Sequence, residues 1–299
     1  MIRPEAPPSP AMPAHAADRP NSATPGYVAY DTRRLSYAST FTDARRAAFI
    51  RAMEWATGKA RLLRLIRRFE REGVETGQGF WSHALRVMGI ELRVAPADLR
   101  RIPRVGPLVV VANHPHGLVD GMILAELIGR VRTDYRILTR SLLTGIPEIE
   151  QFMIPVPFPH DDGAQRLMLE MRRRAQRQLA AGGVVALFPA GAVAASCSWW
   201  GPAIEASWNP FTAKLIRTSG ATILPIRFPG ANSRAYQIAN RISPVLRQGL
   251  LLHEVVHALD RPQAPAIGAP IAPAEWAPHA EGATAFMDWL RARTLAVAA

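Results

Sequence analysis

The chain contains very little cysteine and almost no lysine. Its 299 residues include one cysteine, Cys197, and 36 Lys and Arg residues, of which only Lys59 and Lys214 are lysines. A single cysteine excludes an internal disulfide and any zinc site that needs several cysteines. Nothing in the cysteine content therefore indicates an oxidising compartment.

Acidic residues are also scarce. The 24 Asp and Glu residues leave a formal net charge of +12. A strongly cationic surface attracts anionic partners, which include lipid head groups, nucleic acid and phosphorylated carriers. The length is enough to bury a full core in one large domain.

Two further absences concern targeting and membrane insertion. The N-terminus carries proline, alanine and scattered charges where a secretory signal needs an apolar core. Residues 179–204 lack charge, but small residues and helix breakers interrupt them, which favours strand and loop over a transmembrane helix. The breakers are Gly182, Gly183, Pro189, Gly191 and Gly201. We therefore expect a soluble or peripheral protein.

Composition divides the chain into three regions. Residues 1–26 are rich in proline and alanine without apolar periodicity, which predicts a disordered tail. Residues 27–90 predict a basic amphipathic helical region, in which Thr42 or Asp43 caps the first helix and Gly58 separates it from the second. A third helix is expected at 80–88, and residues 91–299 form the α/β domain.

The second of these helices is strongly basic. Its apolar face consists of Leu62, Leu63, Ile66 and Phe69, and arginines at 61, 64, 67, 68 and 71 dominate the rest. One interpretation is a solvated helical layer that packs on the body. The other is a membrane-surface element, with arginine at the head groups and the apolar edge shallowly inserted.

Strand and helix patterns alternate from residue 91 onward. Strands are expected at 91–95, 107–113, 135–139, 152–156, 184–188, 221–228 and 264–271. Helices are expected at 119–131, 163–181, 211–219 and 245–259, the last of these being the final helix. This order predicts an α/β fold with a mixed central sheet flanked by helices, preceded by N-terminal amphipathic helices. Ligand chemistry is then expected on the loops at one edge of the sheet.

The strand at 107–113 runs directly into His114-Pro115-His116-Gly117. A residue before proline is pushed out of the α region, so His114 should lie extended at the strand end. Pro115 is acceptable in the first helical turn, and Asp120 then falls near the helix start, where free amides favour a carboxylate. His114 and Asp120 could form a general-base dyad, in which the carboxylate fixes the tautomer and stabilises the imidazolium.

Two alternatives compete with that dyad. His116 stands four residues before Asp120 and would share its helix face if the helix starts early. A strand-to-helix corner with no catalytic role would also account for the residues. The local pattern leaves all three interpretations open.

The stretch NHPHGLVDG resembles the first signature of the glycerolipid (lysophospholipid) acyltransferase superfamily, an Asn-His followed shortly by Asp. It is similar to the bacterial hemolysin-like branch, which includes lyso-ornithine-lipid acyltransferase-like proteins and has the form NHPxGxxDG. Three further blocks match in order: FPAGAV at 188–193, WNPFTAKLIRTSGATILPIRFPGANS at 208–233 and IGAPI at 267–271. The resemblance covers about residues 30–272. The family usually has four residues between His and Asp, and this chain has five.

The resemblance implies an O-acyltransferase that moves a fatty acyl group to the hydroxyl of a lysolipid. His114 would deprotonate that hydroxyl, Asp120 would orient His114, and the hydroxyl would attack the thioester of acyl-CoA or acyl-carrier protein. Backbone amides at 189–191 would stabilise the oxyanion or hold the acceptor. No acyl-enzyme, cofactor or metal is implied, so Cys197 is expected to be a small buried residue.

The resemblance also implies a set of substrate-binding residues. They are Asn113, His116, Gly117, Arg140, Phe188, Pro189, Ala190, Gly191, Arg227 and Asn232. The commoner family loop, FPEGTRS, holds the acceptor phosphate with its Glu and Arg, where this chain has Ala190 and Val193. A phosphate acceptor would then depend on another arginine, such as Arg140, Arg227 or Arg234.

The implied partners are a lysolipid, the acyl donor and an anionic membrane surface, without nucleic acid. The implied location is cytoplasmic, peripheral on the inner face of the membrane. Trp199 and Trp200 are candidates for contact with the membrane. They could wall an acyl chain, anchor at an interface or pack in the core.

Other interpretations assign the chain to different classes. The stretch His253-Glu254-Val255-Val256-His257 has the zinc-peptidase pattern, with Glu254 as base and Glu275 or Glu281 as a third ligand. The pattern is short, and no extended metalloprotease signature follows it.

A second metal interpretation joins His114, His116 and Asp120, but the Asp-His pair typical of metallohydrolases does not follow His116. A non-enzymatic protein whose arginine-rich helices bind a membrane or nucleic acid is the third alternative. Charge alone does not distinguish those partners, and no recognised nucleic-acid motif accompanies the helices.

Overall fold

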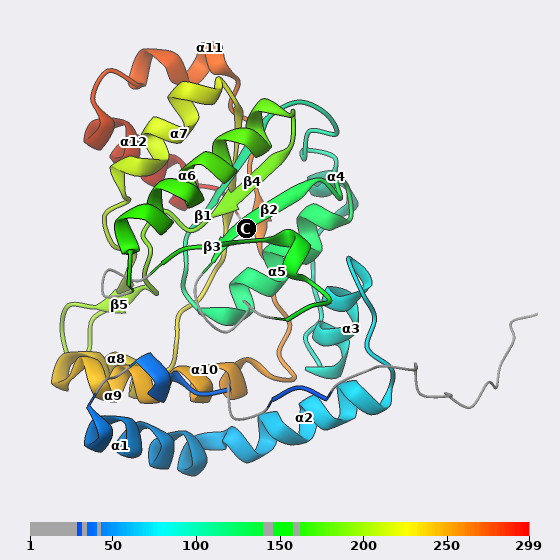
Figure 1. Cartoon of the computed structure of the whole chain (residues 1–299). Coiled ribbons are helices and arrows are strands. Elements are labelled where there is room, and N and C mark those ends of the chain that lie inside the picture. The colour runs from blue at the N-terminus through cyan, green and yellow to red at the C-terminus, as the bar shows by residue number, and fades with distance from the viewer. Residues whose placement is uncertain (1–28, 32–34, 41–42, 140–145, 158–161, 299) are drawn as a thin grey trace, which may run out of the picture.

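A six-stranded mixed sheet forms the centre of the molecule (Figure 1). The computed structural model describes residues 29–31, 35–40, 43–139, 146–157 and 162–298, so the tail predicted at 1–26 lies outside it. The strands are β1 (Leu108–Ala112), β2 (Tyr135–Thr139), β3 (Met153–Pro155), β4 (Val184–Leu187), β7 (Thr222–Arg227) and β8 (Ala266–Ile267). Their order is β3-β2-β4-β1-β7-β8, and all neighbours are parallel except β7 and β8. The predicted α/β fold with a mixed sheet is therefore confirmed.

Strand β1 lies inside the sheet and is buried on both faces. Because successive side chains of a strand point to opposite faces, Leu108, Val110 and Ala112 join one core cluster and Val109 and Val111 join the other. The helices of the first cluster include α3 (Gly79–Val87), α5 (Leu118–Gly129) and α10 (Leu251–Ala258). Those of the second are α6 (Ala164–Ala180), α7 (Pro210–Ser219) and α12 (Ala283–Leu295). Helices on both faces explain why β1 is a continuous apolar run.

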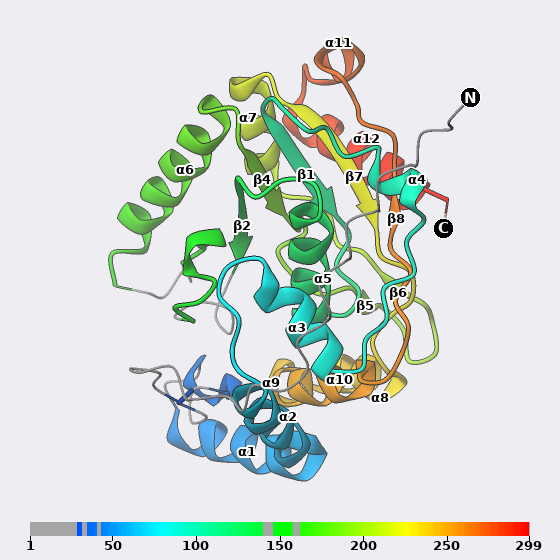
Figure 2. The ribbon, with the colours of Figure 1, turned by 90° about the vertical axis from the view of Figure 1, so that its right-hand side faces the viewer.

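A third layer of helices lies beyond the carboxyl ends of the parallel strands. Figures 1 and 2 both place it at the bottom of the molecule. Besides α10 it contains α1 (Ala44–Glu54), α2 (Ala60–Arg71), α8 (Arg234–Ile242) and α9 (Pro244–Gly249). This layer faces the sheet edge at which the histidine-containing loop leaves β1.

The N-terminal helices follow their predicted boundaries. The side chain of Asp43 caps α1 by accepting from the backbone N–H of Arg46. Gly58, with a φ of 130°, kinks the chain inside the π-helical turn η3 (Trp55–Lys59) and so separates α1 from α2. Leu62 and Phe69 of α2 are buried in the first core cluster. The apolar face of α2 therefore packs on the body, as the first interpretation of this helix requires.

Some predicted elements differ from the structure. Residues 91–95 form only one bridge, between Leu92 and Gln263, and not a strand. The helix expected at 245–259 is divided into α9 and α10 at Leu250, and it is not the final helix, because α12 follows. Helix α8 was not expected; it begins where the Ser233 side chain accepts from the backbone N–H of Tyr236. The expected loop after Phe188 contains a hairpin of β5 (Ala195–Ser196) and β6 (Ala203–Ile204).

Short elements complete the description. They are η2 (Tyr37–Thr40), α4 (Pro96–Leu99), η5 (Glu150–Phe152), α11 (Pro273–Trp276) and η6 (Ala277–His279). Across the described ranges, no helix has both the length and the apolar character needed to cross a bilayer.

Candidate active site

Asp120 connects both histidines of the loop after β1. Its carboxylate is fully buried. Oδ2 lies 3.0 Å from Nδ1 of His114, and Oδ1 lies 3.0 Å from Nδ1 of His116. Oδ2 also accepts from the backbone N–H groups of His116 at 2.8 Å and Gly117 at 3.1 Å. One carboxylate therefore orients two imidazole rings and closes the turn between them.

The turn is possible because Gly117 adopts a φ of 77°, in the region that favours glycine. Gly117 is the N-cap of α5, and Asp120 is the third residue of that helix. The helix therefore begins at Leu118, one residue before its expected start, and Pro115 lies outside it in the preceding turn. His116 reaches Asp120 through this capping turn and not through a shared helix face.

The electrostatics of the group favour an ionised Asp120. Burial raises the pKa of its carboxyl, but hydrogen bonds and charge from His114 and His116 outweigh burial and lower the pKa overall. Burial lowers the pKa of His116, yet the hydrogen bond and charge of Asp120 outweigh it and raise the pKa. Because an ionised carboxylate only accepts hydrogen bonds, Nδ1 of each ring donates to Asp120, and in a neutral ring Nε2 then carries no proton and can accept one.

A cavity distinguishes the two histidines. It has a volume of about 430 Å³, and its lining includes His114 but not His116. Nε2 of His116 instead faces Gly230, where an added β-carbon would lie 3.0 Å from it. His114 is therefore the ring that a ligand in the cavity can reach.

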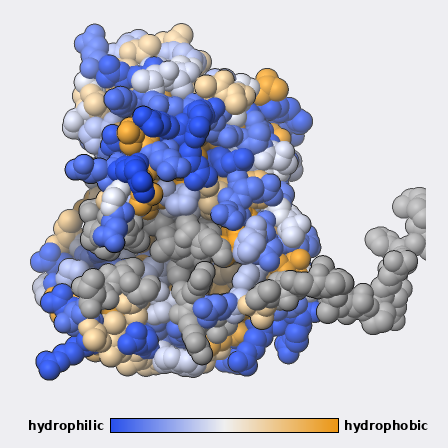
Figure 3. All heavy atoms as spheres, viewed as in Figure 1, coloured by the Kyte–Doolittle hydropathy of each residue, from blue (hydrophilic) through white to orange (hydrophobic). Residues whose placement is uncertain are grey.

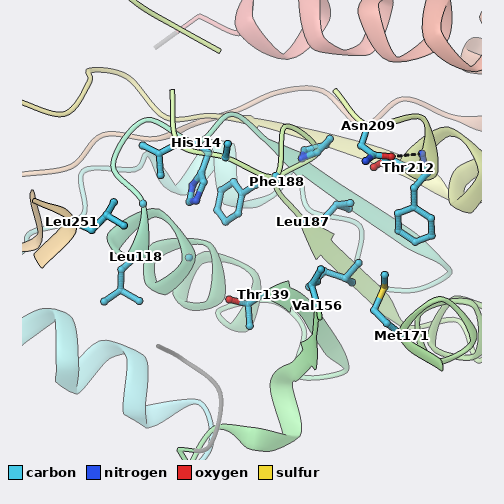
Figure 4. Close-up of a pocket in the computed structure, with 18 of the residues that line it drawn as sticks. His114, Leu118, Thr139, Val156, Met171, Leu187, Phe188, Asn209, Thr212 and Leu251 are labelled. Carbon is cyan, nitrogen blue, oxygen red and sulfur yellow. Dashed lines mark hydrogen bonds between the residues drawn. The ribbon is translucent and has the colours of Figure 1, made fainter. Parts of the chain in front are cut away.

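The cavity differs in character on the two sides of His114. Figure 4 shows His114 beside Phe188, with Leu251 on one side and Met171 on the other. The Met171 side is mainly apolar, because Leu138, Val156, Met168 and Phe211 pack with Met171 in the second core cluster. Asn209 and Thr212 also lie on this side. The Leu251 side includes polar groups on Tyr37, Tyr236, Arg247 and Gln248.

Phe188 fixes the plane of the His114 ring. The two rings stack, with centroids 4.0 Å apart and an interplanar angle of 21°. Phe188 directly follows β4, the neighbour of β1 in the sheet, so the adjacent strand ends bring these residues together. Phe188 lines the cavity, as do Gly117, Pro189 and Gly191.

Glu205 supports the backbone of His114 and was not anticipated. Its Oε2 accepts from the His114 backbone N–H at 3.2 Å, and its Oε1 accepts from the Trp208 indole at 3.1 Å. Burial raises the pKa of the Glu205 carboxyl against the opposing effect of these two donors. The available signal was its position as the first charged residue after the uncharged stretch 179–204.

Several predicted substrate-binding residues lie outside the cavity lining. The amide of Asn113 donates to Phe228 O at 2.8 Å and accepts from Phe228 N at 2.7 Å, so it ties the end of β1 to the end of β7. Ala190 packs on the second core cluster. Asn232 is buried, and His116 lies against Gly230 as described above. These four residues surround the loop without lining its cavity.

The structure places two of the three arginines considered for an acceptor phosphate. Arg227 donates to the backbone oxygen of Val297 at 2.9 Å, and Arg234 donates to that of Gly201 at 2.8 Å. Neither lines the cavity. Arg140 lies outside the described residues.

The segment 189–191 offers few backbone donors. Pro189 has no N–H, and the N–H of Gly191 donates to Phe188 O at 3.0 Å in a turn. Of the three residues in this segment, Ala190 is therefore the one whose backbone N–H could serve as the predicted oxyanion donor.

The tip of the β5–β6 hairpin is exposed. Trp199 and Trp200 are 49% and 78% exposed, so the expectation of core packing is wrong, and neither residue lines the cavity. Cys197 is also exposed, which contradicts the expected buried cysteine.

The three polar side chains of the zinc-peptidase pattern on α10 contact other protein groups. The Glu254 carboxylate accepts from Ser233 N at 2.7 Å and Ser233 Oγ at 2.6 Å. Nδ1 of His253 lies 3.1 Å from Thr57 O, and Nε2 of His257 lies 2.9 Å from Arg261 Nη1. Among residues placed by the structure, no three His, Cys, Asp or Glu side chains form a group that could hold a metal ion.

Comparison with known proteins identifies the class. A family model described as acyltransferase matches residues 69–255, which include the whole loop from β1 to α5 and the FPAG segment. The chain belongs to this acyltransferase family and is an acyltransferase. The chain is also similar to a solved structure, the 1-acyl-sn-glycerophosphate (LPA) acyltransferase PlsC from Thermotoga maritima, with a TM-score of 0.48 and 14% sequence identity. That alignment covers 88% of this chain and 91% of the other. No curated protein sequence matches the chain.

Proposed function

We propose that the protein is a lysolipid O-acyltransferase in which His114 is the general base and Asp120 orients it. One observation carries the proposal: of the two histidines bound to the buried Asp120, only His114 lines the cavity. The motif NHPHGLVDG further favours the hemolysin-like branch of the superfamily, with acceptors of the lysophospholipid or lyso-ornithine-lipid type.

The proposed reaction needs no covalent enzyme intermediate. Nε2 of His114 takes the proton of the acceptor hydroxyl as the oxygen attacks the thioester carbonyl. The C–O bond forms, the C–S bond of the tetrahedral intermediate then breaks, and the thiolate recovers the proton from His114. Asp120 stabilises the transient imidazolium, because it is a buried carboxylate 3.0 Å from Nδ1. The products are an ester and a free thiol.

The apolar side of the cavity fits a fatty acyl chain. Leu138, Val156, Met168, Met171 and Phe211 line it, and it leads to the stacked pair His114 and Phe188. A chain held there would place its carbonyl beside the base. This supports an acyl thioester as donor.

Helix α6 supports a donor that carries negative charge. Its exposed arginines are Arg166, Arg172, Arg173 and Arg177. Arg172 lines the apolar side of the cavity, and hydrophilic residues crowd the part of Figure 3 in which α6 lies. Acyl-CoA and acyl-carrier protein are both anionic, so the positive charge suits either donor.

Exposed aromatic residues support the proposed peripheral membrane location. Trp199 and Trp200 at the hairpin tip have the amphipathic character that suits a membrane interface. Sedimentation with anionic vesicles tests this part of the proposal. If wild type and the Trp199→Ser, Trp200→Ser double variant bound the vesicles equally, these two residues would have no part in membrane binding.

The experiment that tests the proposed function is an acyl-transfer assay with purified protein. Labelled palmitoyl-CoA or palmitoyl-carrier protein is incubated with a panel of lysophospholipids and lyso-ornithine lipid, and the lipid products are separated. The proposal expects a diacylated product and stoichiometric free thiol. Release of free fatty acid without acyl transfer to any acceptor would contradict it.

A further inference from the structure

We infer that Arg247 binds the anionic head group of the acceptor, on the side of His114 opposite the acyl chain. This inference rests on the proposed function, because it assigns one substrate group to a part of the same cavity. Arg247 belongs to α9, outside the blocks that carry the resemblance to acyltransferases.

Charge is sparse in the cavity. Among the described lining residues, the permanently charged side chains are Arg172 and Arg247. The FPAG segment, residues 188–193, contributes only uncharged side chains to the lining. Within the described part of the chain, these two arginines are therefore the cations that a substrate anion in this cavity can contact.

The two arginines lie at opposite ends. Arg172 is exposed on α6 and stands over the ring of Phe211, 5.3 Å from its centroid, at the apolar side. Arg247 precedes Leu251 by four residues, and Figure 4 shows Leu251 beyond His114 from the apolar side. Arg247 is the cation of the polar side.

The surroundings of Arg247 suit an anion. Tyr236 lines the cavity together with Arg247. Burial raises the pKa of Tyr236 to about 12, the charge of Arg247 opposes that rise and the charge of Glu254 adds to it, so the phenol stays protonated. Tyr37 and Gln248 line the same side. The phenol of Tyr236 beside the guanidinium can donate to a phosphate or carboxylate oxygen.

The guanidinium is held but not neutralised. Its Nη1 donates to Asn240 Oδ1 at 3.1 Å, which fixes the group against α8. In the part of the chain that the structure describes, no carboxylate lies within ion-pair distance of Arg247, although the residue is half-buried. A half-buried cation without a counter-ion gains from binding an anion, and its planar fork presents further N–H donors for two oxygens.

The ligand is an acidic group close to the attacking hydroxyl. Both a phosphate and a carboxylate on a lysolipid head group meet that description. The phosphates of acyl-CoA are the other possible source of the anion, and the experiment separates the two by varying one substrate at a time.

Kinetics with paired acceptors tests the inference. The probes are lysophosphatidate and its uncharged counterpart monoacylglycerol, each varied at saturating palmitoyl-CoA, and palmitoyl-CoA varied at saturating acceptor. The variants are Arg247→Gln, Arg247→Lys and, as a matched control, Arg241→Gln. Arg241 is exposed on the neighbouring α8 and does not line the cavity.

The expected result is specific to charge. Arg247→Gln should raise the KM for lysophosphatidate by about 10- to 100-fold, since hydrogen bonds to charged groups contribute about 1.5–3 kcal/mol. The values for monoacylglycerol and palmitoyl-CoA should change little, Arg247→Lys should recover part of the loss, and Arg241→Gln should behave as wild type.

Two results would overturn the inference while leaving the proposed function intact. A higher KM for palmitoyl-CoA alone would assign Arg247 to the donor. An equal loss with charged and uncharged acceptors would show a structural role. If wild-type protein transferred acyl groups to neither acceptor nor to lyso-ornithine lipid, the proposed function and the inference would both fail.

Discussion

The rings of His114 and Phe188 stack with centroids 4.0 Å apart. This contact joins the two sequence blocks to which we assign the proposed chemistry, NHPHG after β1 and FPAG after β4. Asp120 holds one edge of the imidazole through Nδ1, and Phe188 holds its face. Together they fix the direction in which Nε2 points.

A Phe188→Leu substitution should lower kcat with little effect on the KM for the acceptor. Leucine keeps the site apolar but removes the flat surface against the imidazole, and a misplaced catalytic group costs up to about 100-fold in rate. Steady-state kinetics on both substrates measures this. A raised KM for the acyl donor at unchanged kcat would instead show that Phe188 only walls the acyl chain.

An Asp120→Asn substitution should change how stability depends on pH. The pKa of Asp120 is lowered in the folded protein, so its contribution is present above the unfolded pKa of about 3.9 and is lost as pH falls through the folded value. The pKa of His116 is raised, so its contribution is present below about 6.5 and is lost as pH rises through the folded value. Asparagine removes the carboxylate on which both contributions depend.

Urea unfolding of wild type and Asp120→Asn between pH 3 and pH 9 measures this. Near neutral pH the variant should lose about 3–5 kcal/mol, because removing one partner leaves buried groups unpaired. The difference between the two proteins should shrink toward pH 3. A difference that stays constant with pH would contradict the assignment of charge to Asp120.

A larger side chain on the apolar side of the cavity should shift the enzyme's preference toward shorter acyl chains. Val156→Phe places a larger side chain in the lining. Transfer from long-chain donors should fall by about 10-fold or more relative to short-chain donors, since even single methylenes are worth about 10- to 200-fold in an apolar pocket. Leu169→Phe is the matched control, because Leu169 is exposed on α6 and outside the lining. Equal selectivity in both variants would place the acyl chain elsewhere.

The zinc-peptidase pattern should prove structural. Glu254→Ala leaves the N–H and hydroxyl of Ser233 without their acceptor and should cost about 1–3 kcal/mol in the free energy of unfolding. His253→Ala should retain acyl transfer, and a chelator should not change the activity. Stoichiometric zinc together with loss of activity in His253→Ala would overturn this interpretation.

Local rules predicted that His114 lies at the end of a strand and that Asp120 lies near the start of the following helix. Both follow from neighbouring residues, because Pro115 restricts His114 and a helix start favours a carboxylate. They did not predict which histidine faces the ligand. That depends on the cavity beside Phe188 and on Gly230, which are 74 and 116 residues away from His114.

The other features that the sequence did not predict also depend on tertiary contacts. Glu205 bonds the backbone of a residue 91 positions away, and Arg247 reaches the cavity from a helix that sequence patterns did not separate from α10. The exposure of Trp199 and Trp200 depends on a hairpin with two-residue strands. Such short strands leave no period by which sequence could reveal them.

The most direct test of the central claim compares His114→Ala with His116→Ala in the acyl-transfer assay. Both rings bond Asp120 at 3.0 Å, so a purely structural role would penalise them similarly. We predict that His114→Ala lowers kcat by about 10²- to 10⁴-fold, the usual contribution of a general base, and that His116→Ala retains most of its activity once folded. Full activity in His114→Ala with loss in His116→Ala would show that the base is the other ring.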